Sequence, residues 1–212
     1  MNLQTVFQTR YPPLTLDDLL VSAQRPDGAE LLAFANAYEG GFSTCARVES
    51  RFFLTQLREH FHRGAAPEEA IDKSLSRFFQ QFPSAPDADS DVFAYDPTLS
   101  FVAVWRINGE FRAAALGGEV ARVWKAKALL ATFPPEEQRM LRLPGGSALI
   151  KKSAGRDRRD PIAWTTLPPG ERLEILSFRL AEVLGDGPSP QSVNDLPQSD
   201  HIFVACATWT IP

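Results

Sequence analysis

The sequence has few of the residues that usually carry disulfide, redox or transition-metal chemistry. Its 212 residues include two cysteines, Cys45 and Cys206, and three histidines. The cysteines lie far apart and neither belongs to a C-x-x-C pair, so we interpret both as buried free thiols in a reducing compartment. His60 and His62 are two residues apart and therefore point to different faces of a helix, which makes them a poor metal pair.

Long apolar runs and a strong charge of either sign are also missing. No run of about 18 apolar residues occurs, so we expect no transmembrane helix and no insertion into a membrane. Met1 to Arg10 have neither the basic nor the apolar region of a signal peptide, which predicts a cytoplasmic protein. The formal net charge of −4 gives no general attraction to nucleic acid. We therefore expect no nucleic-acid partner.

The motifs of three common enzyme classes are absent as well. The sequence contains no G-x-S-x-G nucleophile elbow, no phosphate-binding G-x-x-x-x-G-K-[ST] loop and no dinucleotide-binding G-x-G-x-x-G. Apolar residues, by contrast, are plentiful. Hydrophobic residues make up 44% of the chain and charged residues 23%, which is enough for one buried core. We expect a single domain over residues 1–212.

The first half of the chain predicts a β-hairpin followed by two helices. Two strand-like runs, Asp18 to Ala23 and Leu31 to Ala35, are joined by proline and Asp-Gly turn residues. After the glycines of a Tyr38 to Gly41 corner, Ser43 is a suitable N-cap for a long helix. A second helix is expected from Pro67, antiparallel to the first.

The long helix is expected to have one apolar and one charged face. Its apolar side comprises Cys45, Val48, Phe52, Leu57 and Phe61, and its charged side comprises Arg47, Glu49, Arg51, Arg58 and Glu59. This spacing predicts a helix that packs on the core and keeps its other side in water.

The second half predicts mainly strands. Leu99 to Ile107 and Glu110 to Leu116 flank Asn108-Gly109, a favoured two-residue hairpin turn. Gly117-Gly118 is then expected to bend the chain into a further strand, Glu119 to Lys125. These runs predict an antiparallel meander.

Weaker signals follow. We expect a strand at Leu129 to Phe133, a short helix or an excursion at Pro134 to Arg142, a strand at Glu171 to Leu176, a helical turn at Phe178 to Leu184, and a closing strand at His201 to Thr208. Leu143 to Pro169 has no clear signal. The order of elements predicts an α+β domain in which helices cover antiparallel sheet.

One segment of the weak region is strongly basic. Lys151 to Arg159 carries five cations and one anion. We interpret it as a solvated loop, with an acidic or phosphate-bearing partner as the alternative.

Several local strings, taken in order, resemble motifs of the type 2C protein phosphatases, which are metal-dependent Ser/Thr phosphatases. The family's Asp-Gly-x-Gly-Gly corner, between a strand and a long helix, matches Ala37 to Gly41. Its Gly-Asp-Ser-Arg matches Gly117 to Val120, and its Ser-Asp-Gly-Leu matches Ser177 to Leu180. Its Asp-Asn pair before the last strand matches Asp200-His201, while its early Asn-x-Asp has only Asp17-Asp18.

The resemblance implies a four-layer α-β-β-α sandwich with a degenerate site. In the family, carboxylates hold two Mg²⁺ or Mn²⁺ ions that activate a water for attack on the phosphoryl group. The matching positions here are Ala37, Tyr38, Gly118, Phe178, Arg179 and Asp200. Asp200 alone is a clear carboxylate among them, and Arg179 would replace part of the metal charge with a fixed cation. The resemblance therefore implies no catalytic residue and no metal cofactor.

A rearranged carboxylate site is the alternative. Glu119 takes the place of the aspartate missing from the Gly-Asp motif if the register shifts by one residue, and Glu39 lies two positions from Ala37, where the corner aspartate is lost. Together with Asp18 and Asp200, these residues would form a divergent Mn²⁺ or Mg²⁺ site.

The resemblance implies a pseudophosphatase that acts as a protein-binding or regulatory module in phosphorylation-linked signalling. Its expected partner is a protein, such as a component of kinase signalling or of secretion. The alternatives are a divergent Mn²⁺- or Mg²⁺-dependent Ser/Thr phosphatase and a structural subunit of a larger assembly.

Overall fold

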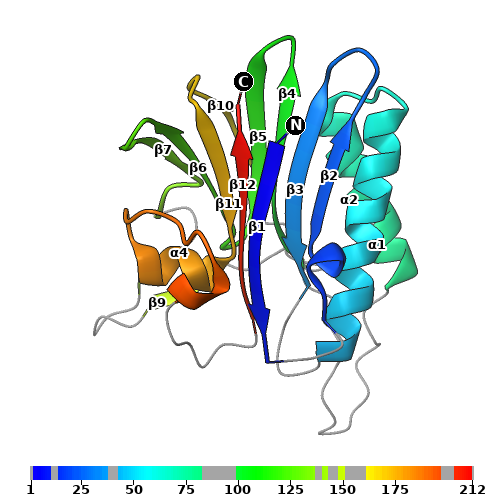
Figure 1. Ribbon diagram of the computed structural model, residues 1–212. Coiled ribbons are helices and arrows are strands. Elements are labelled where there is room, and N and C mark those ends of the chain that lie inside the picture. The colour runs from blue at the N-terminus through cyan, green and yellow to red at the C-terminus, as the bar shows by residue number, and fades with distance from the viewer. Residues whose placement is uncertain are drawn as a thin grey trace, which may run out of the picture.

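Two five-stranded antiparallel sheets form the centre of the molecule (Figure 1). The computed structural model describes residues 2–10, 14–37, 43–82, 99–136, 140–142, 148–150, 161–196 and 203–211. One sheet, here called the β1 sheet, has the order β1 (Asn2–Thr9), β12 (Phe203–Thr210), β11 (Arg172–Leu176), β6 (Val120–Lys125), β7 (Ala128–Phe133). The other, the β3 sheet, has the order β10 (Ala163–Leu167), β5 (Glu110–Leu116), β4 (Ser100–Ile107), β3 (Glu30–Asn36), β2 (Leu20–Gln24). A small third sheet pairs β8 (Met140–Arg142) with β9 (Ala148–Ile150).

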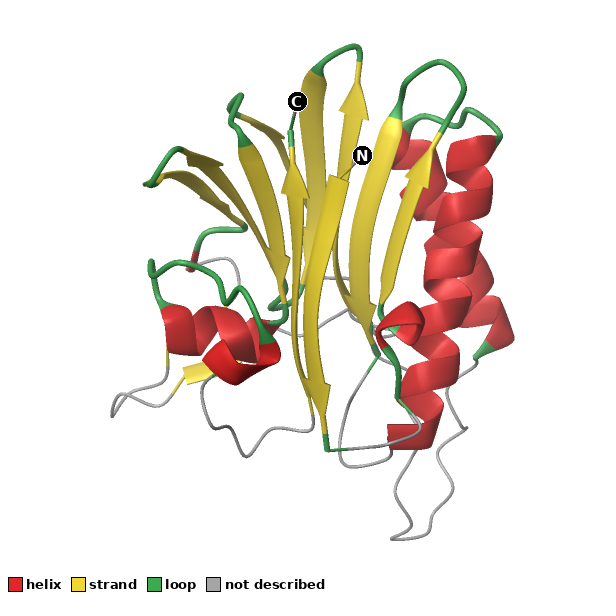
Figure 2. Ribbon diagram, in the orientation of Figure 1, coloured by secondary structure: helices red, strands yellow, loops and turns green. Residues whose placement is uncertain are grey.

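Helices cover the outer faces of the two sheets, as Figure 2 shows. The long helices α1 (Ser43–His62) and α2 (Pro67–Gln81) pack on the β3 sheet, and the short helix α4 (Phe178–Leu184) packs on the β1 sheet. Two 3-10 turns, η1 (Leu16–Asp18) and η2 (Val193–Asp195), complete the described elements. The predicted α-β-β-α order of layers is confirmed. No described helix combines the length and the apolar character that a membrane crossing requires.

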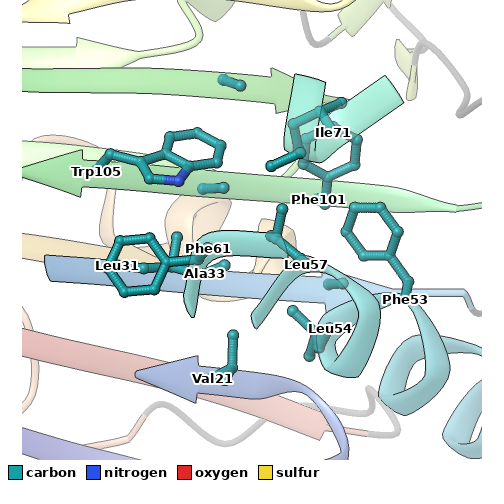
Figure 3. Packing of buried hydrophobic residues seen from close by; sticks show 14 of the residues in the cluster. Val21, Leu31, Ala33, Phe53, Leu54, Leu57, Phe61, Ile71, Phe101 and Trp105 are labelled. Atoms are coloured by element: carbon teal, nitrogen blue, oxygen red, sulfur yellow. The ribbon is translucent and has the colours of Figure 1, made fainter. Parts of the chain in front are cut away.

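Three apolar clusters hold the four layers together. On β3, Leu31 and Ala33 face the helices while Leu32 and Phe34 face the other sheet, so both sides of this strand are buried. That is why its sequence is continuously apolar rather than alternating. Figure 3 shows the helix side, where Phe53, Leu57 and Phe61 of α1 lie over the β3 sheet with Phe101 and Trp105. Each such buried side chain contributes about 1.5 to 3 kcal/mol.

In the first two turns of α1, the buried and exposed sides differ from the apolar and charged faces that the sequence predicts. The inward stripe runs through Phe53, Leu57 and Phe61 at intervals of four residues, and Glu49 occupies the preceding position of that stripe. Glu49 is accordingly 2% exposed, whereas Val48, predicted to be buried, is 58% exposed. The prediction is wrong at these two positions because the apolar spacing shifts phase along the helix.

The hairpin β4–β5 is confirmed, but the meander after it is wrong. Asn108 and Gly109 both have positive φ, of 53° and 83°, as the two-residue turn requires. After β5, the chain passes through Gly117-Gly118 into the other sheet, where β6 pairs with β7 and β11. The other edge of β5 pairs with β10 instead. β10 lies within Leu143 to Pro169, the stretch without a clear secondary-structure signal.

Three further strands were not expected from the sequence. β1 has a single buried residue, Val6, and is recognisable only through its pairing with β12 along its whole length. β8 covers the last three residues of the stretch expected to be a short helix or excursion, in which Glu136 is helical, and β9 lies in the stretch without clear signal. β2 begins at Leu20, because Asp18 belongs to η1. The basic run Lys151 to Arg159 lies outside the described residues.

Candidate functional site

The strand register brings three of the degenerate positions, Ala37, Gly118 and Phe178, to one end of the sandwich, the lower end in Figure 1. Asn36, the last residue of β3, pairs with Ser100, the first of β4. At the same end, Val120 at the start of β6 pairs with Leu176 at the end of β11. Ala37, Gly118 and Phe178 lie within two residues of these strand ends, so the fold gathers them although they are far apart in sequence.

Ala37 is tied to the first helix rather than directed at an ion. Its backbone N–H donates to the hydroxyl Oγ of Ser50 at 2.9 Å, and its methyl group belongs to the apolar cluster beneath α1. A buried methyl group offers no ligand to a hard cation. The corner that follows, including Tyr38 and Glu39, lies outside the described residues.

The phenyl ring of Phe178 packs directly on the backbone of Gly118. A Cβ atom at position 118 would lie 2.7 Å from Cδ2 of Phe178, a separation that real contacts essentially never show. Phe178 is 6% exposed and opens α4 at the end of β11. The matched motifs have aspartate at positions 118 and 178. Here the contact between the Phe178 ring and the Gly118 backbone fills the space at both positions.

Ser100 organises the turn on the other side of Gly118. Its hydroxyl accepts a hydrogen bond from the Gly118 N–H at 3.2 Å and donates one to Oε2 of Glu119 at 2.7 Å. Gly117 has φ of +87°, and a Cβ atom there would lie 2.4 Å from the Ser100 hydroxyl, so only glycine fits. Glu119 is buried, and its carboxylate takes part in holding this turn.

Ser177 closes the same end of the β1 sheet. Its hydroxyl accepts from the N–H of Ala205 at 3.1 Å, and its own N–H donates to the Ala205 carbonyl at 2.9 Å. The start of α4 is thus fixed to β12. This restraint holds Phe178 in place over Gly118.

Asp18 is fully buried and already paired. Its Oδ2 atom accepts hydrogen bonds from the N–H and hydroxyl of Thr15, at 3.0 and 2.9 Å, and lies 2.9 Å from Nε of Arg47. Arg51, one turn further along α1, approaches Oδ1 at 3.6 Å. Burial alone would raise the pKa of Asp18, but the Thr15 hydrogen bonds and the Arg47 charge outweigh it and lower this pKa.

Asp18→Asn is expected to reduce the free energy of unfolding on the order of 1 kcal/mol at neutral pH, since the amide keeps one acceptor but loses the charge. Because the pKa of Asp18 is lowered on folding, its stabilisation is present above 3.8 and is lost as the pH falls through the folded value. Urea unfolding of both proteins at pH 7 and pH 2.5 measures the difference. If the two proteins differed in their free energy of unfolding by as much at pH 2.5 as at pH 7, the lost stability could not be assigned to the charge of this carboxylate.

Arg179 does not lie at an isolated cationic site. Its guanidinium pairs with Glu182 on α4 at 2.7 Å, and it stacks over the ring of Phe178 at 5.0 Å from the centroid. The expectation that Arg179 replaces metal charge stays a prediction, since Tyr38 and Asp200, beside which it would act, lie outside the described residues. Sequence reasoning missed Ser50 and Ser100, which belong to no motif, and it did not show that Ser177, the serine of a matched motif, bonds to β12.

Comparison with solved structures identifies the fold. The chain superimposes on the S. agalactiae serine/threonine phosphatase with a TM-score of 0.66, at 11% identity, over 99% of this chain and 100% of that one. The type 2C phosphatase fold is therefore present. The serine/threonine phosphatase Stp1 from Staphylococcus aureus gives 0.63 at 13% identity, with 99% and 94% covered. The PPM Ser-Thr phosphatase MsPP from Mycobacterium smegmatis gives 0.60 at 14% identity, with 98% and 97% covered. No family model and no curated protein matches the sequence.

The metal ions that this fold commonly holds do not fit the described residues. Among them, no three histidine, cysteine or acidic side chains come together in a way that would hold an ion. Ala37, Gly118 and Phe178 offer no side-chain oxygen, and Asp18 is paired with Arg47. Of the rearranged set Asp18, Glu39, Glu119 and Asp200, the structure describes only Asp18 and Glu119, and each is engaged by a neighbouring hydroxyl group.

Proposed function

We propose that the chain is a type 2C phosphatase-like domain without phosphatase activity, and that it acts as a protein-binding or regulatory module in phosphorylation-linked signalling. The contact between Phe178 and Gly118 carries this proposal. An aspartate at position 118 would collide with the ring, so an acidic side chain cannot be restored there while Phe178 is present. The fold remains while the space for ligands at these positions is closed.

The intact remainder of the site supports a role in binding. Ser50, Ser100 and Ser177 hold the turns at this end of the sandwich through buried hydrogen bonds. A surface of this kind, with the half-buried Arg47 and the exposed Arg51 held beside it by Asp18, suits recognition of a protein partner. We propose a cytoplasmic protein of a kinase-signalling or secretion system as that partner.

Titration with Mn²⁺ tests the proposal. Calorimetry is expected to show no specific binding of Mn²⁺, and an aryl phosphate is expected to remain unhydrolysed in its presence. A divergent phosphatase using Asp18, Glu39, Glu119 and Asp200 predicts the opposite result. Saturable Mn²⁺ binding, together with turnover that Asp200→Ala abolishes and Asp195→Ala retains, would overturn the proposal. Asp195 is a suitable control because it caps the exposed η2 turn.

A structural role in a larger assembly predicts a different physical behaviour. Such a subunit would sediment as an oligomer or lose stability in isolation. Analytical ultracentrifugation of the purified chain distinguishes the two, since a regulatory module is expected to sediment as a stable monomer.

A further inference from the structure

A polar pocket of about 680 Å³ lies between the end of α1 and one face of α2. His60 and Arg63 line it from α1 and the following turn, and Lys73 and Arg77 line it from α2, together with Glu69 and Asp72. His60 and Ser43 are separated by about 25 Å along the axis of α1. The pocket is therefore at the opposite end of this helix from the degenerate site.

The backbone groups at the end of α1 are already satisfied. Gly64, with φ of +80°, ends the helix in a Schellman motif, in which the N–H groups of Gly64 and Ala65 donate to the carbonyls of Phe61 and His60. Arg25 also donates to the Phe61 carbonyl at 3.3 Å. These carbonyl groups are not available to hold a cation, so the side chains determine what the pocket binds.

The side chains leave one cation without an acidic partner. Lys73 pairs with Glu69 at 2.6 Å, and Arg63 pairs with Glu59 at 3.5 Å. Arg77 instead donates one hydrogen bond to the neutral amide oxygen of Gln56, at 2.6 Å. Within the described residues no carboxylate forms an ion pair with Arg77. A guanidinium has five N–H donors, so most of its capacity for a bidentate partner is unused.

His60 is the second unusual group. Its side chain is 5% exposed, and its Nε2 atom has no hydrogen-bond partner within the described residues. Burial and the nearby cations, Arg77 first among them, lower the pKa of His60, with only Glu59 opposing. A buried polar nitrogen without a partner destabilises the fold, and an arriving acceptor would recover part of that loss.

We propose that this pocket binds a phosphate monoester carried by a phosphorylated protein segment. Two phosphate oxygens would accept from Arg77 as a bidentate pair, and the third from Nε2 of His60, so that the guanidinium gains an anionic partner and the imidazole a hydrogen-bond acceptor. A pocket of this volume holds more than a lone ion, and its polar walls suit the peptide groups beside a phosphoserine. The proposal goes beyond the function proposed above and does not depend on it, since the two sites lie at opposite ends of α1.

Binding of inorganic phosphate to the full chain is the first test, followed through the NMR signals of the histidine rings. The chain has three histidines, so His60→Gln assigns the signal of His60 by its disappearance, and His62→Gln and His201→Gln assign the other two. Bound phosphate is expected to raise the pKa of His60. Arg77→Gln is expected to weaken binding about tenfold or more, because a charge-assisted pair is lost. Arg58→Gln on an exposed side of α1 should leave it unchanged. Arg77 is itself exposed, so its variant is expected to fold.

A phosphoserine peptide and its unphosphorylated form distinguish the source of the phosphate. The phosphorylated peptide is expected to bind about tenfold more tightly than inorganic phosphate, and the unphosphorylated one not at all. Peptide binding no tighter than that of inorganic phosphate would restrict the site to small oxyanions and overturn the assignment to a phosphoprotein. A His60 signal that does not respond to phosphate, or responds equally in Arg77→Gln, would overturn the site itself.

Discussion

Glu49→Gln is expected to raise the free energy of unfolding by up to about 3 kcal/mol at pH 8 and to leave it nearly unchanged at pH 4.5. Burial beneath α1 raises the pKa of Glu49 from 4.5 to about 7. Its Oε1 atom has no hydrogen-bond partner in the part of the chain that the structure describes. The folded protein therefore holds a proton that the unfolded chain has already released.

The direction of the pH dependence follows from that difference. Between pH 4.5 and about 7 the unfolded state binds fewer protons at this residue than the folded state, so stability falls as the pH rises. Above the folded pKa, the ionised Glu49 destabilises the protein by the full amount. Below pH 4.5, Glu49 is protonated in both states, so this destabilisation disappears. Glutamine has nearly the same shape and no charge, so it removes this dependence.

Urea unfolding of the wild type and Glu49→Gln across pH 4.5 to 8 measures the effect. Glu59→Gln on the same helix is the matched control, because Glu59 is partly exposed and pairs with Arg63. The control is expected to change stability by less than about 0.5 kcal/mol at every pH. Parallel pH profiles for the wild type and Glu49→Gln would show that the carboxylate is ionised in the folded protein.

The sequence predicts the elements of this fold better than their partners. Asn108-Gly109 defines the β4–β5 hairpin locally, through two residues that tolerate positive φ. The pairing of the strand after Gly117 is not determined by local sequence, because β6 pairs with β11, some fifty residues further along the chain. β1 is the clearest failure, since a strand with one buried residue has no periodicity to detect.

In the candidate site, too, the sequence predicts which segments come together but not the contacts between them. The motif order predicts that Ala37, Gly118 and Phe178 lie together, and the strand ends bring them to one end of the sandwich. The sequence does not show that Phe178 rests on Gly118, because contact across two sheet ends depends on packing rather than spacing. It also misplaces Glu49, since the phase of a helix is fixed by the surface it covers.

The contact between Phe178 and Gly118 is expected to appear as a coupling energy of about 1 to 2 kcal/mol. Gly118→Ala should cost about 2 kcal/mol, because the new Cβ atom would overlap the ring. Phe178→Ala should cost about 3 to 4 kcal/mol through the cavity that it leaves. The double variant should cost less than the sum, since removing the ring makes room for the methyl group.

A double-mutant cycle measured by urea unfolding tests this coupling, with Phe111→Ala in place of Phe178→Ala as the control. Phe111 is similarly buried but lies about 16 Å along β5 from the Gly117 turn, so its cycle with Gly118→Ala should be additive within about 0.5 kcal/mol. If the costs of Gly118→Ala and Phe178→Ala were additive, the ring would move aside without a cost in stability, and an acidic side chain at position 118 would be tolerated. Coupling there would mean that the missing carboxylates of two separate motifs share one structural cause, a phenyl ring that occupies their space.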